Sequence, residues 1–244
     1  MMTSASRATT RRILRQLRHD PRTVALLLIV PVLLVVLLRY MFDSAAAFDR
    51  VAPALLGIFP FVVMFLVTSV TTLRERTSGT LERLMTMPLS KLDLLTGYAC
   101  AFGLLAVVQA LAVTGVSLRP LGLTVSGSTG LLLTVAVLDA LLGTALGLFV
   151  SAFARTEFQA VQFMPAVVFP QLLLCGLFVP RAHMAQPLRW ASDVLPLSYA
   201  VDALERAAAG TTGTADLVRD LSVIAGSALA ALALAAATLR RRTP

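Results

Sequence analysis

The sequence predicts an all-α integral membrane protein with six transmembrane helices. Hydrophobic residues make up 57% of its 244 residues and charged residues only 14%, whereas ordinary soluble domains carry about 25% charged residues. The mean hydropathy is +0.83, and apolar runs near the ~20 residues that cross a bilayer as a helix recur along the whole length. A chain of this composition is expected to pass through a membrane several times.

The positive charge of the chain does not indicate a nucleic acid as its partner. The formal net charge is +8, but no basic stretch carries interleaved aromatic residues on which bases could stack. The two cysteines, Cys100 and Cys175, lie near opposite ends of predicted helices, which disfavours a disulfide between them. Two histidines and two cysteines are scattered without metal-ligand spacing, so we expect no metal site and no cofactor in this chain.

Residues 1–22 are predicted to contain an amphipathic helix that lies in the membrane interface. After a polar start, a helical pattern places Ile13, Leu14 and Leu17 opposite a face of arginines. That face consists of Arg11, Arg15, Arg18 and Arg22. In such a helix the arginines bind anionic headgroups while the apolar face enters the membrane lipids. A nucleic-acid-binding tail is the alternative, which the adjoining apolar span disfavours.

Residues 23–240 form the predicted transmembrane unit, and residues 241–244 form a cytoplasmic tail. The predicted spans cover about residues 23–41, 51–73, 92–118, 130–153, 158–179 and 217–239. A basic start, an apolar core and the run Ala45-Ala46-Ala47 leave a cleaved signal peptide as the alternative for the first span. The long leader of 22 residues and Arg39, directly beside the apolar core, favour a retained helix.

Polar residues inside the spans are candidates for a substrate pathway. The second span carries Thr68 and Thr72, whose hydroxyl groups can instead bond to backbone carbonyls of their own helix. The fifth span carries Gln159, Gln162 and Gln171 together with two prolines. We therefore expect the fifth span to face protein or a cavity rather than lipid.

The fourth span combines an acidic residue with a pair of glycines. An ionisable group at the depth of Asp139 costs at least ~2.5 kcal/mol on insertion, so it is expected to face protein or water. It is either a contact for substrate or protons, or a structural carboxylate with a partner, and the sequence leaves both open. Gly143 and Gly147 form a G-x-x-x-G pattern, which permits close packing of helices.

The distribution of basic residues places both termini in the cytoplasm. With this orientation the cytoplasmic side holds fourteen lysine and arginine residues and the outer side seven. Six arginines precede the first span, which is the clearest argument for the orientation. We expect a multi-pass protein of the cytoplasmic (inner) membrane, and the arginine- and alanine-rich composition indicates a bacterial source.

A short charged segment at residues 74–91, RERTSGTLERLMTMPLSK, separates the second and third spans. It has the pattern of a small amphipathic helix, since Thr80 can cap an N-terminus and Pro88 ends the helix after about two turns. Leu81 and Leu84 form an apolar edge, and Glu82 faces water. A basic loop that merely obeys the positive-inside rule is the alternative, but the order of residues is more specific than the charge.

This segment closely resembles the cytoplasmic segment of the type-2 ABC transporter permeases, in particular their daunorubicin-resistance-type branch. The matching positions are Glu75, Gly79, Thr80, Leu81, Glu82, Leu84, Pro88 and Ser90, whereas Thr77 and Ser78 make a small departure. The resemblance implies a coupling helix that docks on an ATP-binding subunit, in a complex of two permeases and two ATP-binding chains. It also places the second and fifth helices at the centre of the permease pair, formed by two copies or by a similar chain.

A second stretch, residues 180–210, resembles the same family. The run Leu195-Pro196-Leu197-Ser198-Tyr199-Ala200 matches a segment that the family places in a pair of short outer helices before the last span. The stretch is too polar to span the membrane and is interrupted by Pro187 and Pro196, so we expect short re-entrant or interfacial helices. Without the resemblance it is an amphipathic external loop.

The chain lacks the residues that bind ATP. Its one lysine, Lys91, lies in LSKLD and not in a Walker motif, so Mg-ATP is expected on the partner subunit and this chain is not expected to be an enzyme. The resemblance implies the permease of an exporter for an amphipathic drug, antibiotic or lipid-like substrate, with polysaccharide or glycolipid export as the nearest alternative. An ion-coupled carrier using Asp139 has only that one acid to support it, and an intramembrane enzyme would need clustered catalytic residues.

Overall fold

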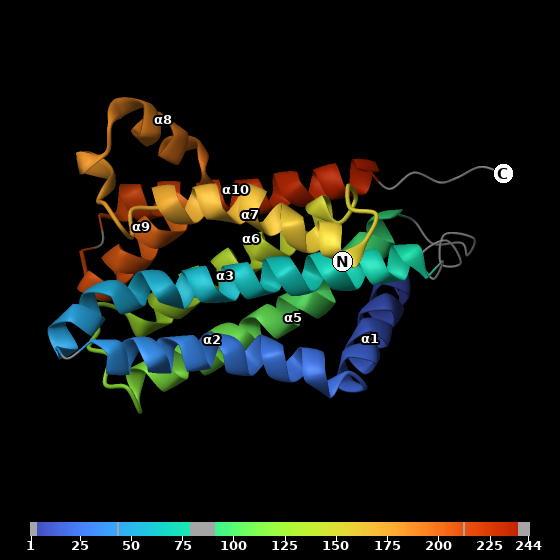
Figure 1. The fold of residues 1–244 in the computed structure, drawn as a ribbon, viewed down its shortest axis with the longest axis horizontal. Helices are drawn as coiled ribbons and strands as arrows, with labels where there is room; N and C mark the ends of the chain where they lie inside the picture. Colours follow the sequence, from blue (N-terminus) through green and yellow to red (C-terminus); the bar gives the residue numbers. More distant parts are fainter. Residues whose placement is uncertain (1–3, 43, 79–90, 212, 239–244) are drawn as a thin grey trace.

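The computed structural model describes residues 4–42, 44–78, 91–211 and 213–238. Regular structure in these residues is helical, which confirms the all-α prediction for them. In chain order the helices are α1 (Ser4–Arg18), α2 (Pro21–Met41), α3 (Ala45–Thr77), α5 (Lys91–Leu118), α6 (Thr129–Val150), α7 (Glu157–Leu174), the 3₁₀ turn η1 (Arg181–His183), α8 (Gln186–Val194), α9 (Pro196–Ala209) and α10 (Thr214–Thr238). The long helices run side by side, α1 lies across one end of them, and α8 and α9 lie at the other end (Figure 1).

Five helices in the described part of the chain are long and apolar enough to cross a membrane, namely α2, α3, α5, α6 and α10. They coincide with the first, second, third, fourth and sixth predicted spans. The predicted fifth span corresponds to α7, which has 18 residues and is not among the five. One glutamate and three glutamines in α7 lower its apolar content. It ends at Leu174, earlier than predicted, and Gly176 after it adopts a φ of 104° that a helix does not use.

The boundary between the N-terminal helix and the first span lies a few residues earlier than predicted. α1 ends at Arg18, and α2 begins at Pro21, so Arg22 belongs to α2 and not to the arginine face of α1. Asp20 caps α2 because its carboxylate accepts hydrogen bonds from the Thr23 hydroxyl at 2.6 Å and the Thr23 backbone N–H at 3.2 Å. These two bonds hold the pKa of Asp20 below its usual value. Proline in the first turn needs no N–H partner and fixes this corner.

The centre of the bundle is α3, which packs against α2, α5, α6, α7 and α9. Its contact with α6 depends on the predicted glycine pair. A Cβ atom on Gly143 would lie 2.3 Å from the backbone oxygen of Phe61, and one on Gly147 would lie 2.5 Å from the backbone oxygen of Phe65. The close packing predicted from the G-x-x-x-G pattern is therefore confirmed, and α3 and α6 run in the same direction.

The end of the bundle that holds α9 is fixed by the loop between α5 and α6. The backbone N–H groups of Ser126 and Gly127 donate to the carbonyl oxygen of Ala208 at 2.9 and 3.1 Å. A Cβ on Gly127 would lie 2.1 Å from the oxygen of Ala207, so only glycine permits this approach. α9 is therefore held against the loop by backbone contacts and ends at Gly210 in the left-handed conformation.

Candidate functional site

The candidate site lies where α1, α3, α5 and α7 meet, at the end of the bundle opposite α8 and α9 (Figure 1). Here α3 ends at Thr77 and α5 begins at Lys91, so the two helix ends that flank residues 79–90 lie at this junction. Of the predicted coupling residues, Glu75 lies in α3. The others, Gly79, Thr80, Leu81, Glu82, Leu84, Pro88 and Ser90, lie outside the described residues.

Glu75 forms a largely buried ion pair that joins three helices. Its side chain on α3 is reached by Arg12 of α1, with 2.8 Å between Nη2 and Oε2. The same guanidinium donates to the hydroxyl of Tyr98 on α5 at 3.2 Å. Glu75 is only 7% exposed. Removal of one partner would leave the other charge in a poorly hydrated place, which in buried pairs costs about 3–5 kcal/mol.

The first turns of α5 carry polar contacts to α1 as well. The Ser6 and Thr96 hydroxyl oxygens are 2.8 Å apart, and the Thr10 hydroxyl donates to the Gly97 carbonyl oxygen at 3.1 Å. Gly97 allows this approach, since a Cβ there would lie 2.6 Å from the side chain of Thr9. Thus α1 is tied to both helices that flank residues 79–90.

The apolar face of α1 is covered by protein, which differs from the predicted insertion into lipid. Ile13 and Leu17 are buried and belong to one apolar cluster with Leu94 and Tyr98 of α5. An amphipathic pattern specifies only that one face is apolar, and here α5 supplies the surface that the prediction assigned to lipid.

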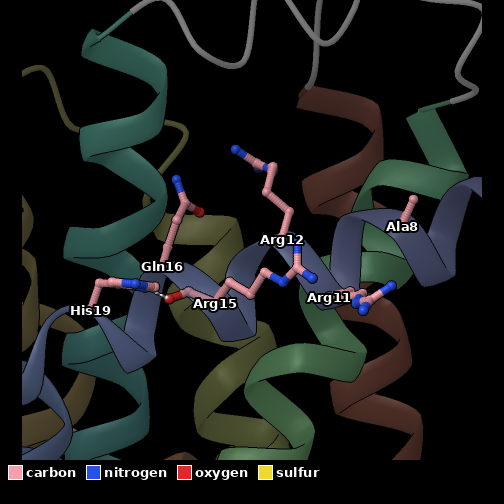
Figure 2. Close-up of a pocket in the computed structure, with 6 residues that line it drawn as sticks. All are labelled: Ala8, Arg11, Arg12, Arg15, Gln16 and His19. Atoms are coloured by element: carbon pink, nitrogen blue, oxygen red, sulfur yellow. Dashed lines mark hydrogen bonds between the residues drawn. The ribbon is translucent and has the colours of Figure 1, made fainter.

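The opposite face of α1 is basic and exposed. Figure 2 shows Arg11, Arg15 and His19 along the helix beside an open hollow of about 640 Å³. Arg11, Arg15 and Arg18 are exposed, as is Arg22 on the neighbouring helix. The predicted basic face therefore exists on α1 for three of its four arginines.

A second ion pair connects the end of α3 to the start of α7. Both carboxylate oxygens of Glu157 accept hydrogen bonds from the Arg74 guanidinium. Nε donates to Oε1 at 2.7 Å and Nη2 donates to Oε2 at 2.8 Å. The hydrogen bond from Arg74 lowers the pKa of Glu157. Both side chains are about half exposed, so the pair contributes at most about 1 kcal/mol to stability. Its two-point geometry still fixes the direction in which α7 starts.

The predicted pathway residues do not gather in one place. Thr68 and Thr72 are buried on α3, and their hydroxyl oxygens have no hydrogen-bond partner in the described part of the chain. Thus neither hydroxyl forms the bond to its own helix that the sequence allowed. Ser69, between them, has an equally unpartnered oxygen.

The three glutamines of α7 have different surroundings. Gln159 accepts a hydrogen bond from the Arg155 backbone at 2.9 Å, near the start of the helix, and Gln162 is exposed. Gln171 is buried near the other end, where its amide donates to the Val167 oxygen at 3.0 Å. Gln159 and Gln171 are twelve positions apart on the helix, a distance of about 18 Å along its axis.

Asp139 lies inside the bundle, where α6 meets α3 and α9. It is 0% exposed, and neither carboxylate oxygen has a hydrogen-bond partner among the described residues. One of these oxygens would lie 2.8 Å from a Cβ on Gly57, so the missing side chain at Gly57 makes room for the acid. Among the residues that the structure describes, none supplies a cation or a donor for Asp139, and this acid is separated from the exposed Gln162.

Replacing Asp139 by asparagine should keep or raise thermal stability, because no ion pair is lost and no charge has to be accommodated. Asp220 is the matched control, since it is also 0% exposed but is paired with Arg206 and Arg219. Asp220→Asn should lower the unfolding midpoint by roughly 5 °C or more. The measurement is thermal unfolding of both purified variants in detergent; an equal loss in both would mean that Asp139 has a partner.

Sequence reasoning missed Arg12, Tyr98 and the Arg74–Glu157 pair. Glu75 lies two residues after the apolar run that ends at Leu73, so it remains close enough to the bundle to need a cation. However, its partner lies 63 positions away, and nothing in the local pattern selects Arg12 from the other N-terminal arginines.

Comparison with known proteins gives a consistent set of matches. The family described as "ABC-2 type transporter" matches residues 5–207 of the chain. "ABC transporter G family member 20" of Dictyostelium discoideum is 26% identical over 64% of this chain and 21% of its own length. "Probable multidrug ABC transporter permease YbhS" of Escherichia coli K12 is 27% identical over 68% of this chain and 45% of its own. "Inner membrane transport permease YhhJ" of the same organism is 28% identical over 53% and 35%. The chain thus spans about half the length, or less, of these curated relatives.

Proposed function

The chain belongs to the ABC-2 type transporter family, and on this premise we propose that it is the membrane permease subunit of an ATP-driven exporter. In this proposal two permease chains associate with two ATP-binding subunits, which bind and hydrolyse Mg-ATP. Residues 79–90 form the coupling helix that receives the movement of the ATP-binding subunits. The multidrug permeases among the relatives support this assignment.

The observation that carries the proposal is the junction around Glu75. A force applied to residues 79–90 acts directly on the ends of α3 and α5, which continue into the bundle. The Arg12–Glu75 pair and the contacts of Ser6 and Thr10 transmit it to α1, and the Arg74–Glu157 pair transmits it to α7. Burial of charge is costly, so the presence of a buried ion pair directly beside residues 79–90 supports a role for this segment in transmitting force.

In the proposed membrane arrangement α7 is the fifth of six spans, and α8 and α9 form the outer re-entrant pair. The protein is a multi-pass protein of a bacterial cytoplasmic membrane with both termini in the cytoplasm. Large apolar side chains on α7, including Phe158, Phe169 and Leu173, are exposed in the single chain. They support contact of α7 with the second permease copy, a similar chain or lipid.

The substrate class we propose is an amphipathic drug, antibiotic or lipid-like molecule, with a polysaccharide or glycolipid as the alternative. The proposed pathway residues remain Thr68, Thr72, Asp139, Gln159, Gln162 and Gln171. The hydroxyls of Thr68 and Thr72, which have no hydrogen-bond partner in the described part of the chain, support these two. The unpartnered Asp139 is the one observation that favours an ion-coupled carrier instead. The exposed Arg11, Arg15, Arg18 and Arg22 are proposed to contact anionic headgroups of the inner leaflet.

Charge reversal or helix breaking in the coupling segment tests the proposal. Glu82→Lys and Gly79→Pro should insert normally into the membrane but lower ATP-dependent export about 5- to 150-fold, the usual range of coupling between two sites. Export into vesicles and ATP hydrolysis are measured on the complex with its ATP-binding subunit. Arg119→Gln, an exposed arginine at the other end of the bundle, is the control. Export at full rate in both coupling variants would contradict the assignment.

A further inference from the structure

A second hollow, of about 650 Å³, lies at the end of the bundle opposite α1, among η1, α8, α9 and the start of α10. Figure 1 shows α8 and α9 at this end, away from the C-terminus. The charged and aromatic residues that line it are Arg181, Arg189, Asp193, Tyr199, Asp202 and Arg219. The proposed coupling to an ATP-binding subunit uses none of them.

The aromatic ring of Tyr199 in this hollow makes cation–π contacts with two arginines. The guanidinium carbon of Arg181 lies 5.2 Å from the centroid of the Tyr199 ring, and that of Arg219 lies 5.7 Å from it. The Tyr199 hydroxyl donates to the backbone oxygen of Asp193 at 2.8 Å. This hydrogen bond fixes the ring, and the ring in turn holds both guanidinium groups at the hollow.

Both acids that line the hollow pair with the same arginine, and three arginines against two aspartates leave the lining with a net charge of +1. Arg181 pairs with both Asp193 and Asp202. Arg219 lies 3.3 Å from Asp220, but Asp220 also pairs with Arg206 and does not line the hollow. In the described part of the chain no ion pair involves Arg189. The cationic groups that retain capacity for an anion are therefore Arg189 and Arg219.

Large apolar side chains are exposed on the segments that carry the lining residues of this hollow. Trp190 is 61% exposed, and Leu188 and Val194 of the same helix are exposed as well. Phe178 and Val179, just before η1, present two further apolar side chains. An anionic ligand with hydrocarbon chains would place its charge among the arginines of the hollow and its chains along this apolar surface. A free inorganic anion would leave the apolar surface exposed to water.

We propose that this hollow binds the phosphate headgroup of an anionic amphiphile, with Arg189 and Arg219 as its ligands. The proposal deepens the proposed function and rests on it for the placement of α8 at the outer face of the membrane. It assigns a site for an anionic lipid-like molecule to the side of the membrane where an exporter releases its substrate.

The only tryptophan of the chain, Trp190, provides the test because it neighbours Arg189. The purified full chain in a neutral detergent is titrated with phosphatidylglycerol carrying bromine on its acyl chains, which quenches nearby tryptophan fluorescence. Phosphatidylglycerol should quench at a lipid fraction about tenfold lower than brominated phosphatidylcholine, which carries the same phosphate but cancels its charge with a quaternary ammonium group that the arginines repel. Arg189→Gln and Arg219→Gln should each remove most of this preference, whereas Arg119→Gln should retain it.

Competition with inorganic phosphate distinguishes the source of the anion. Displacement of phosphatidylglycerol by millimolar phosphate would identify the phosphate group alone as sufficient, and no displacement would identify the lipid-borne headgroup. Equal quenching by both lipids would overturn the proposal, as would an unchanged preference in Arg189→Gln, because this side chain makes no ion pair with the described residues that folding could require. The assay contains no ATP-binding subunit, so its failure leaves the coupling assignment unaffected and a failed export assay leaves this site unaffected.

Discussion

Gly143→Val is expected to prevent the purified chain from forming a stable bundle. The Cβ of any other residue at this position would lie 2.3 Å from the backbone oxygen of Phe61. Because that atom belongs to the backbone of α3, no side chain can rotate away, and α3 and α6 must separate. Separation would also disturb Gly147 against Phe65 and the fit of Asp139 against Gly57, since all three contacts lie along one stripe of α6.

Alanine at the same position gives a graded form of this prediction. Overpacking by one methyl group should lower the unfolding midpoint of Gly143→Ala by roughly 2–12 °C, whereas valine should yield aggregated protein. Gly115→Ala on α5 is the matched control, because nothing lies within 4 Å of its Cβ position and alanine favours a helix. Thermal unfolding in detergent with size-exclusion chromatography measures both. Equal midpoints for Gly143→Ala and Gly115→Ala would contradict the packing described here.

Reversal of the charge at Arg12 is expected to uncouple export from ATP hydrolysis as strongly as a change in residues 79–90. Arg12→Glu places a second acid beside the buried Glu75, so the junction of α1, α3 and α5 should open. Glu75→Arg should have the same effect by placing two cations together. In each single variant we expect ATP-dependent export to fall about 5- to 150-fold while hydrolysis on the partner subunit continues.

The double variant Arg12→Glu with Glu75→Arg restores opposite charges and should recover a substantial part of export. The Tyr98 hydroxyl, which accepts from Arg12, can donate to a glutamate at the same place. Arg7→Glu makes the same charge change at an exposed position of α1 outside the proposed headgroup contacts and should have little effect. Equal export in Arg7→Glu and Arg12→Glu, or no recovery in the double variant, would show that the pair does not transmit the movement.

The sequence predicted most of the helices because length, apolar content and turn residues are local properties. Pro21 begins α2, Gly210 ends α9, and Pro196 lies in the first turn of α9. Gly143 and Gly147 were also recognisable, since close helix packing needs small residues at this spacing. By contrast, α7 was ambiguous because its glutamines balance its apolar residues, and its end at Leu174 depended on the chain direction after Gly176.

Contacts between distant segments were beyond a sequence argument. The periodicity of α1 predicted an apolar face, but a face that packs on α5 and one that enters lipid have the same pattern. The pairing of Arg12 with Glu75 and the unpartnered state of Asp139 depend on which helices become neighbours. The resemblance at residues 74–91 predicted the place of the site, and the ion pairs that hold its flanks became visible only in the folded chain.

The most direct test of the coupling assignment is crosslinking from residue 82. The chain carrying Glu82→Cys, with Cys100 and Cys175 replaced, is co-purified with the ATP-binding protein encoded beside it and treated with a cysteine crosslinker. Ala182→Cys, exposed at the opposite end of the bundle, is the control. We predict a crosslink from residue 82 that changes on addition of ATP, and none from residue 182. Absence of both the partner and the crosslink would contradict the account and favour an ion-coupled carrier that depends on Asp139.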